Sequence, residues 1–372
     1  MTDLNRAGLN LRPATDTRWD LVSLGEVMLR FDPGDTRISR TRSFNVWEGG
    51  GEYNVARALR RCFAQRTALV TALVDNPVGR LIEDLMLQGG VDQSHVLWRD
   101  FDGIGRAARN GVYFLERGFG VRGGMGMMDR GATAISQLKP GDVNWDEIFR
   151  RPGDGGEGAR WFHTGGIMAA LSEDSTALVL EAMQAAQRHG AIVSFDGNYR
   201  PSLWKSRGGR QGSVDVNRAL MPFVDVLFGH EGDVAATLGE SSHHPAAHTL
   251  ETFAPMGRRV TAEFPHLKVI AMSSRKAVSA SRNEWTGFLF AEGHAHQGIT
   301  FPDLEIFDRV GGGDGFAAGV IYGLMQGKGP QWAVDAGIAH GALVMTTPGD
   351  SSMASLPEVE RLMQGGSAAT QR

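Results

Sequence analysis

Residues 309–319 have the sequence RVGGGDGFAAG, in which three consecutive glycines precede a carboxylate. Gly311, Gly312 and Gly313 can bring backbone N–H groups close to a ligand because they carry no Cβ, and the small apolar residues after them indicate the start of a helix. The loop therefore predicts a site for an anion such as phosphate. A carboxylate at its rim, Asp314, would repel bound phosphate, so we expect it to take a proton from an attacking hydroxyl group.

Two other interpretations of this loop stay open. Aspartate is a common N-cap residue, so the stretch could be an ordinary helix start. Residues 313–318 also satisfy GxGxxA and residues 118–123 satisfy GxGxxG, which are weak matches to a dinucleotide-binding fingerprint. Against that fold, Asp335 falls in a helical run instead of at a strand end, and no helix follows the second match. The Walker A pattern GxxxxGK[ST] is absent, which excludes a P-loop kinase.

Predicted strands and helices, which must position this loop, alternate along the chain. Short apolar runs predict buried strands within 19–29, 67–73, 191–201, 224–233 and 268–274. Helical patterns follow several of them, for example from Val55 and over 173–190, whereas 205–215 and 239–263 are predicted as connections. This alternation predicts an α/β fold with a mainly parallel sheet, whose ligands bind beyond the carboxyl ends of the strands.

One region departs from the alternation. Residues 97–135 are rich in glycine and in short alternating pieces, which favours a small antiparallel sheet to which residues 27–47 also contribute. We expect this sheet to form a lid over the active site. Residues 1–18 are predicted to be a flexible leader, and 366–372 a frayed tail.

Composition narrows the class of partner. The 372 residues carry a net charge of −4 without any Lys/Arg-rich block, so we expect a small-molecule ligand and not a nucleic acid. With Cys62 as the only cysteine, a disulfide framework and a thiolate zinc site are excluded, and a reducing cytoplasm is expected. No apolar run reaches the roughly 18 residues of a membrane span, and no signal peptide is recognisable. A zinc site formed by His243, His244 and His248 is a minor alternative.

Two longer stretches carry a family resemblance. GGGEYNVARAL (49–59) and DRVGGGDGFAAGVIYGL (308–324) resemble the two signatures of the ribokinase-like sugar kinases, the PfkB carbohydrate kinase family. DGNYRPSLW (196–204) and AHGALVMTTPGD (339–350) resemble further family segments, so the likeness runs from about Trp19 to Leu362. It implies a ribokinase-like three-layer α/β/α core over 19–365 with a small β-sheet lid. It also implies ATP-dependent phosphoryl transfer to a primary hydroxyl group, with Mg²⁺, a possible monovalent cation and a homodimer.

The resemblance assigns roles to individual residues. The usual loop is Gly-Ala-Gly-Asp, whose amides stabilise the transferring phosphoryl group while the aspartate acts as base. Gly312 replaces the alanine, at a cost of about 0.5–1 kcal/mol of backbone entropy. The implied sugar-binding residues are Gly49, Gly50, Gly51, Asn54, Tyr113, Arg130, Asp196, Asn198, Arg200 and Asp314. The implied nucleotide-binding residues are His230, Asp233, Ser273, Ser274, Gly311, Gly313, His340 and Ala342.

Other positions depart from the family pattern. The usual Asn-x-x-Glu motif, which organises the Mg²⁺ water shell, is His230-Glu231-Gly232-Asp233 here, so Asp233 is expected to reach the metal through water. The strand VIAMSSRKAVSA lacks the usual Gly-x-x-Gly that contacts nucleotide. These departures leave open a kinase-fold protein that binds sugar as a sensor without catalysis.

Two positions, Arg200 and Arg30, suggest the substrate. Arg200 within Asp-x-Asn-Tyr-Arg matches the 2-keto-3-deoxygluconate kinases, in which this arginine reaches the acid sugar and could hold its carboxylate bidentately. Arg30 stands where many members have a sugar-binding aspartate, which weakens a neutral-sugar clamp. A keto-deoxy sugar acid is therefore expected first, and fructose or a related neutral sugar second. In the alternative roles, Arg200 pairs with Asp196, and Asn54 and Glu52 cap the following helix.

Overall fold

The structure is a computed structural model that describes residues 6–240 and 249–366. The histidines considered as a zinc site, at 243, 244 and 248, and residues 367–372 of the predicted tail lie outside the described residues. No helix within the described ranges is both long and apolar enough to cross a membrane.

The body of the protein is a ten-stranded sheet. Its order is β13-β12-β11-β10-β9-β8-β1-β4-β5, and β14 pairs with β12. Every pairing from β5 to β11 is parallel, whereas β12 pairs antiparallel with β11, β13 and β14. The strands are β1 (Leu21–Leu24), β4 (Thr67–Val74), β5 (Val96–Arg99), β8 (Trp161–Gly165), β9 (Ile192–Asp196), β10 (Val226–Gly229), β11 (Val269–Ser279), β12 (Arg282–Ala291), β13 (His294–Gln297) and β14 (Phe301–Glu305).

Helices cover both faces of this sheet, which confirms the predicted three-layer α/β/α core. The sheet strands are apolar on both faces, as β4 shows with all eight residues buried. One face packs against α1 (Gly51–Arg61), α2 (Pro77–Gly89), α10 (Gly312–Met325), α11 (Pro330–Val344) and α12 (Leu356–Met363). The other packs against α3 (Trp145–Phe149), α4 (Gly166–Ala170), α5 (Glu173–Arg188), α7 (Gly209–Leu220), α8 (Glu231–Thr237) and α9 (Leu250–Glu263).

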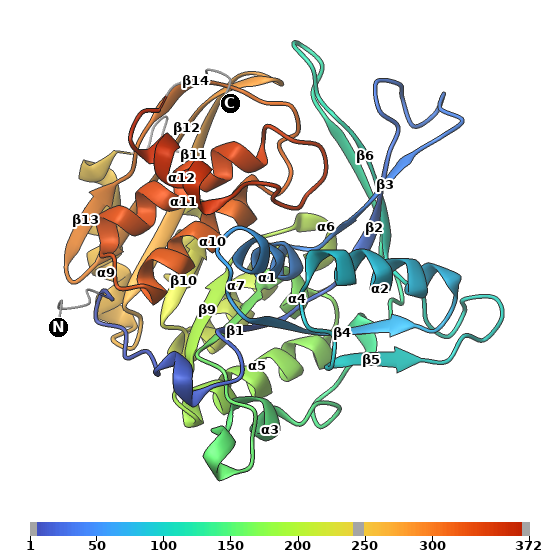
Figure 1. Cartoon of the computed structure of the whole chain (residues 1–372), viewed down its shortest axis with the longest axis horizontal. Helices are drawn as coiled ribbons and strands as arrows, with labels where there is room; N and C mark the ends of the chain where they lie inside the picture. Colours follow the sequence, from blue (N-terminus) through green and yellow to red (C-terminus); the bar gives the residue numbers. More distant parts are fainter. Residues whose placement is uncertain (1–5, 241–248, 367–372) are drawn as a thin grey trace.

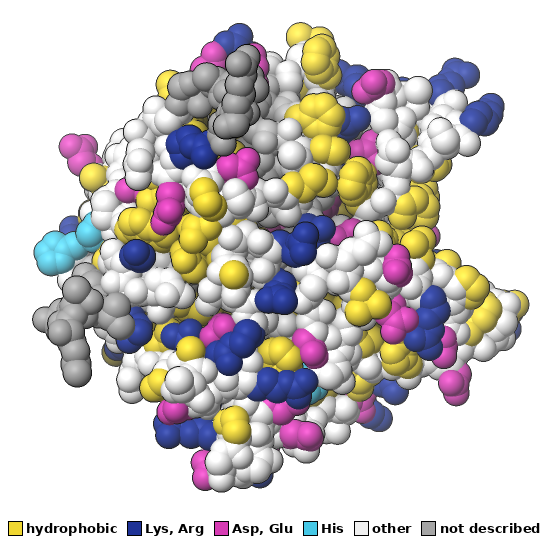
Figure 2. Space-filling model, in the orientation of Figure 1, with side chains coloured by type: hydrophobic (Ala, Val, Ile, Leu, Met, Phe, Trp, Pro, Cys, Tyr) yellow, Lys and Arg dark blue, Asp and Glu magenta, His cyan; other side chains and the backbone are white. Residues whose placement is uncertain are grey.

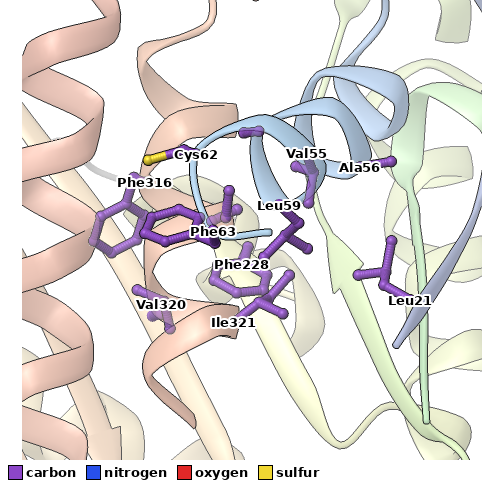
Figure 3. Close-up of a cluster of buried hydrophobic side chains, with 14 of the residues drawn as sticks. Leu21, Val55, Ala56, Leu59, Cys62, Phe63, Phe228, Phe316, Val320 and Ile321 are labelled. Atoms are coloured by element: carbon purple, nitrogen blue, oxygen red, sulfur yellow. The ribbon is translucent and has the colours of Figure 1, made fainter. Parts of the chain in front are cut away.

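Helices α1 and α10 carry the two sequence signatures and pack against each other. Leu59 of α1 and Phe63, which follows the end of α1, lie among Phe316, Val320 and Ile321 of α10 in one buried cluster (Figure 3). Burying each of these side chains contributes about 1.5–3 kcal/mol relative to leaving it exposed. The packing fixes the first turns of both helices, and hence both glycine loops, relative to each other.

A separate four-stranded sheet, here called the small sheet, has the order β3-β2-β6-β7. Its strands are β2 (Met28–Asp32), β3 (Asn45–Gly49), β6 (Val112–Glu116) and β7 (Met125–Asp129), and the labelled ones stand apart from the main sheet in Figure 1. The predicted small sheet is thus confirmed, although β2 pairs with β6 in parallel and not antiparallel. Residues 97–99, at the start of the region predicted for it, belong to the main sheet as part of β5.

Two sequence predictions are wrong. Residues 6–18 do not form a loose leader: Leu9 and Leu11 are buried in the core, and Arg12 donates hydrogen bonds to the carbonyls of Phe149 and Ala159 at 2.8 and 3.2 Å. Burial of this irregular segment depends on distant partners and leaves no periodic pattern. The connections predicted at 205–215 and 239–263 include the helices α7 and α9, whose buried sides become apparent only against the sheet. The short helix α6 (Pro201–Trp204) lies between β9 and α7.

Candidate active site

A cavity of about 1140 Å³ lies between the carboxyl ends of the main-sheet strands and the small sheet. The main sheet contributes Asp196 at the end of β9 and Gly229 at the end of β10, and the small sheet contributes Gly49 and Met128. The cavity also contains the loop of residues 311–313. Its position agrees with the expectation that ligands bind where parallel strands end.

The loop of Gly311, Gly312 and Gly313, here called the anion loop, leads directly into α10. Gly311 is the N-cap with a φ of +81°, a backbone conformation that favours glycine. A Cβ at Gly311 would also overlap the carbonyl oxygen of Asp350, whereas a Cβ at Gly313 would meet nothing within 4 Å. The helix N-terminus therefore opens into the cavity with its amides accessible to an anion.

Asp314 lies in the first turn of α10 and is not its N-cap, so the ordinary-cap interpretation is wrong. Its Oδ2 accepts a hydrogen bond from Nδ2 of Asn54 at 2.7 Å. Burial and the nearby charges of Asp196 and Asp350 raise its pKa to about 7, while the bond from Asn54 opposes this rise. A carboxylate of this pKa takes up and releases a proton near neutral pH, as a general base must.

Asn54, predicted to bind sugar, lines the cavity and orients Asp314. Its Oδ1 also accepts the N–H of Gly50 at 3.4 Å. Helix α1 begins at Gly51 with Gly50 as its N-cap, so neither Asn54 nor Glu52 is the N-cap residue. Asn54 contributes to capping only by accepting the N–H of Gly50.

Two carboxyl groups, those of the buried Glu52 and the half-buried Asp196, accompany Asp314. Burial, followed by the charges of Asp314 and Asp196, raises the pKa of Glu52 to about 8. Burial and the charge of Asp233 raise the pKa of Asp196 to about 6. Glu52 packs closely against the main sheet, because a Cβ at Gly165 would lie 3.0 Å from its Oε1. Glu52 was not predicted as a cavity residue; its place inside the first signature was the only available signal.

Two arginines predicted to bind the substrate have different environments. Arg200 lines the cavity, is exposed and makes no ion pair within 4 Å among the described residues, so the alternative of a direct pair with Asp196 is wrong. The two groups still interact over a longer distance, because the charge of Arg200 opposes the rise in the pKa of Asp196. It follows Asn198, which has a φ of +31° and also lines the cavity. Arg130 lies on the opposite wall with its Nε 3.4 Å from Oε2 of Glu26, a buried carboxyl group whose pKa is raised by burial.

Tyr113, one of the implied sugar-binding residues, has a partner within the protein. Tyr113 of β6 is buried and donates a hydrogen bond from its hydroxyl group to Oδ2 of Asp350. Both side chains lie beside Gly49, at which a Cβ would come within 2.6 Å of each. Tyr113 and Gly49 therefore form one wall of the cavity together with Asp350, which sequence reasoning did not select.

Of the residues predicted to bind nucleotide or metal, some line the cavity and others do not. Asp233 and His230 line the cavity, but both oxygens of Asp233 accept backbone N–H groups, from Tyr199 at 3.1 Å and from His230 at 3.0 Å. This carboxylate therefore fits an outer, water-mediated contact with Mg²⁺ better than a direct bond. No group of three or more possible metal ligands occurs within the ranges 6–240 and 249–366.

Three of the residues predicted to bind nucleotide do not line the cavity. Ser273 lines it, whereas Ser274 does not. His340 and Ala342 are buried on α11 behind α10. The ring nitrogens of His340 lie 2.7 Å from the carbonyl oxygen of Gly315 and 2.7 Å from Oγ of Ser352, and burial lowers its pKa to about 4. His340 and Ala342 are thus packing residues, because α11 turns this face toward α10.

Two arginines that sequence reasoning missed lie at the same end of the cavity. Arg275 of β11 and Arg309, two residues before the anion loop, both line it. Neither makes an ion pair within 4 Å in the part of the chain that the structure describes, and desolvation and the charge of Arg309 lower the pKa of Arg275. Two neighbouring guanidinium groups without acidic partners favour a polyanionic ligand here. The position of Arg309 beside the glycines was the available signal.

Comparison with known proteins finds similarity to carbohydrate kinases. The model of the pfkB family carbohydrate kinases matches residues 157–357. A 2-dehydro-3-deoxygalactonokinase of Haloferax volcanii is 30% identical over 356 residues, covering 95% of this chain and 99% of that protein. The crystal structure of a 2-dehydro-3-deoxygluconokinase from Thermotoga maritima superposes with a TM-score of 0.84 at 33% identity, covering 93% of this chain and 99% of that chain. A 2-dehydro-3-deoxygluconokinase of Thermoproteus tenax is 28% identical over 353 residues, covering 92% of this chain and 94% of that protein.

Proposed function

Because this chain belongs to the pfkB family of carbohydrate kinases, we propose that it transfers the terminal phosphate of ATP to a primary hydroxyl group of a keto-deoxy sugar acid. The observation that carries the proposal is the position of Asp314, one residue after an accessible loop of amides and 2.7 Å from Asn54. Asp314 accepts the proton of the substrate hydroxyl group, and the anion loop stabilises charge on the transferring phosphoryl group.

The donor occupies the end of the cavity next to the anion loop. Arg275 and Arg309 supply positive charge for the polyphosphate, and the N-terminus of α10 adds its dipole. Asp233 would hold Mg²⁺ through water, and the ion would supply further positive charge for the polyphosphate. A monovalent cation stays a prediction.

The acceptor occupies the region between Gly49, Asp196 and Arg200. Arg200 supports an acidic acceptor because it is a cavity-lining cation that makes no ion pair within 4 Å in the described part of the chain. Arg30, in the position of the usual sugar-binding aspartate, is fully buried and does not line the cavity, so a neutral-sugar clamp is missing there. The names of the relatives from H. volcanii, T. maritima and T. tenax support the same substrate class.

The small sheet serves as the lid and as the surface for a second copy of the chain. All five residues of β7 are exposed, including Met125, Met127 and Met128, and apolar side chains gather over this part of the molecule in Figure 2. We expect a homodimer in a reducing cytoplasm, and light scattering of wild type and Met127→Lys tests the dimer. Monomeric wild-type protein would contradict it.

A coupled assay of ADP release tests the activity. The panel contains 2-keto-3-deoxygluconate, 2-keto-3-deoxygalactonate, 5-dehydro-2-deoxygluconate and fructose, each with ATP and Mg²⁺. We expect kcat/KM for a 2-keto-3-deoxy acid to exceed that for fructose by about 10- to 100-fold, the value of one charge-assisted contact. Preference for fructose would overturn the substrate class. Calorimetric binding of a sugar without any turnover would identify a sensor instead of an enzyme.

A further inference from the structure

Arg30 of β2 is fully buried, with no exposed side-chain surface, and its guanidinium group contacts three carboxylates. Its Nη2 donates to Asp32 at 2.9 Å and to Asp308, and its Nη1 donates to Asp350 at 2.8 Å. Asp32 lies on the same strand, whereas the other two carboxylates are 278 and 320 residues away in the sequence. One side chain of the small sheet therefore connects to two distant segments.

Those two segments flank the anion loop. Asp308 precedes Gly311 by three residues, and its Oδ1 accepts the N–H of Val310 at 3.3 Å. The backbone of Asp350 packs directly on Gly311, where a Cβ would overlap the Asp350 carbonyl oxygen. Arg30 thus holds both the entry to the loop and the chain segment on which the loop rests.

The buried carboxyl groups of Asp308 and Asp350 require a positive charge at position 30. Burial raises the pKa of Asp308 and of Asp350, and the positive charge of Arg30 opposes both increases. Two further neighbours lie at the edge of the group: Arg117 with its Nε 3.5 Å from Oδ2 of Asp32, and Tyr113 donating to Asp350. Without Arg30, two buried carboxyl groups beside the loop would have no guanidinium partner, which is strongly unfavourable in a protein interior.

We propose that Arg30 is a positioning residue for phosphoryl transfer, which fixes the amides of Gly311, Gly312 and Gly313 relative to the small sheet through Asp308 and Asp350. The inference rests on the proposed kinase function and deepens it. Arg30 touches no substrate itself, because it does not line the cavity. Arg30 instead aligns the anion loop with the cavity wall that Gly49 and Tyr113 form beside the sugar acceptor.

A role in stability alone predicts a different result. If Arg30 only stabilised the fold, the folded fraction of a variant would keep the wild-type kcat and the wild-type mobility of the loop. If it positions the loop, a folded variant has faster amide exchange at 311–313 and a lower kcat, because small displacements of catalytic groups cost about 100-fold in rate.

The test compares Arg30→Met and Arg30→Lys with wild type and with Arg109→Met. Arg109 is a matched control near the small sheet, because it pairs with Asp129 of β7 at 2.9 Å but is 40% exposed and does not line the cavity. Folding is checked by circular dichroism, and hydrogen exchange of a peptide covering 306–316 is measured without ligands. Steady-state kinetics then give kcat and both KM values.

We expect Arg30→Met to lower kcat by about 30- to 100-fold with each KM changed less than about threefold, and to speed exchange at the loop by at least about tenfold. For Arg30→Lys, kcat and loop exchange should lie between those of wild type and Arg30→Met. Arg109→Met should match wild type in both. Folded Arg30→Met with unchanged exchange and kcat would overturn the proposal. If Arg30→Met does not fold, Asp350→Asn replaces it, with the same expected directions and the same overturning result.

The two proposals fail separately in this design. If wild type phosphorylates no sugar acid, the proposed function is wrong, but loop exchange in the Arg30 variants still decides whether Arg30 fixes the loop.

Discussion

The side-chain amide of Asn54 donates a hydrogen bond to the carboxylate of Asp314 at 2.7 Å, although 260 residues separate them in the sequence. The two sequence signatures of the chain therefore meet in a single contact. Helices α1 and α10 bring it about, because their packed apolar faces leave their N-terminal turns side by side at the cavity.

Asp314→Asn should abolish most of the activity. The amide keeps the shape of the side chain but cannot accept the substrate proton, so kcat should fall by about 100- to 10,000-fold while KM for ATP stays within about threefold. Single-turnover kinetics measure the chemical step directly. Transfer at the wild-type rate by the folded variant would contradict the role of Asp314 as base.

The acid limb of the pH–rate profile should follow the pKa of Asp314, which is about 7. The base must be deprotonated, so kcat should decrease as the pH falls below this value. Asn54→Leu removes the hydrogen bond that favours the charged form, which should move the acid limb to higher pH. Asp196→Asn removes a negative neighbour and should move it to lower pH. Shifts in the same direction for both variants would refute this assignment.

Arg200→Ala should reduce discrimination in favour of sugar acids. Loss of a charge-assisted hydrogen bond to the substrate carboxylate should raise KM for the acid by about 10- to 100-fold, with little change for fructose. Arg188→Ala is the matched control, because that arginine is 58% exposed and does not line the cavity. An equal loss for acid and neutral sugars in Arg200→Ala would argue against a carboxylate contact.

Arg275→Met and Arg309→Met should weaken donor binding. Each removes a cation from the end of the cavity next to the anion loop, so KM for ATP should rise by about tenfold while KM for the sugar acid changes little. Lys276→Met on the same strand as Arg275 is the control, because Lys276 is exposed and does not line the cavity. Titration with an ATP analogue provides the same comparison at equilibrium. Unaltered nucleotide affinity in both arginine variants would exclude this location for the polyphosphate.

Glu52→Gln should change how stability depends on pH. Between about pH 4.5 and 8 the folded protein keeps the proton on Glu52 while the unfolded chain releases it. The free energy of unfolding of wild type therefore falls as the pH rises through this window. The variant lacks this contribution, so urea unfolding at pH 5 and pH 8 should show a smaller decrease. The exposed Glu292→Gln serves as control, and a pH dependence equal to wild type in Glu52→Gln would disprove the raised pKa.

Much of the fold and part of the site could be predicted from the sequence, because local chemistry limits what these segments can do. A run such as residues 67–74, in which only Thr67 and Thr71 interrupt the apolar residues, favours a strand covered on both faces, and β4 is such a strand. A glycine triplet before a helical pattern leads to a helix N-terminus with open amides, as at Gly311, whatever surrounds it.

Only the tertiary structure decided the partners of the charged and polar side chains. Arg30 occurs in an ordinary strand pattern, yet it is buried among carboxylates from three places in the chain. His340 looked suited to a nucleotide but is held between Gly315 and Ser352, and Asn54 contacts Asp314. The physical reason is that the type and spacing of residues determine local backbone conformation. A buried charge, in contrast, is paired with whichever distant segment the packed core places next to it.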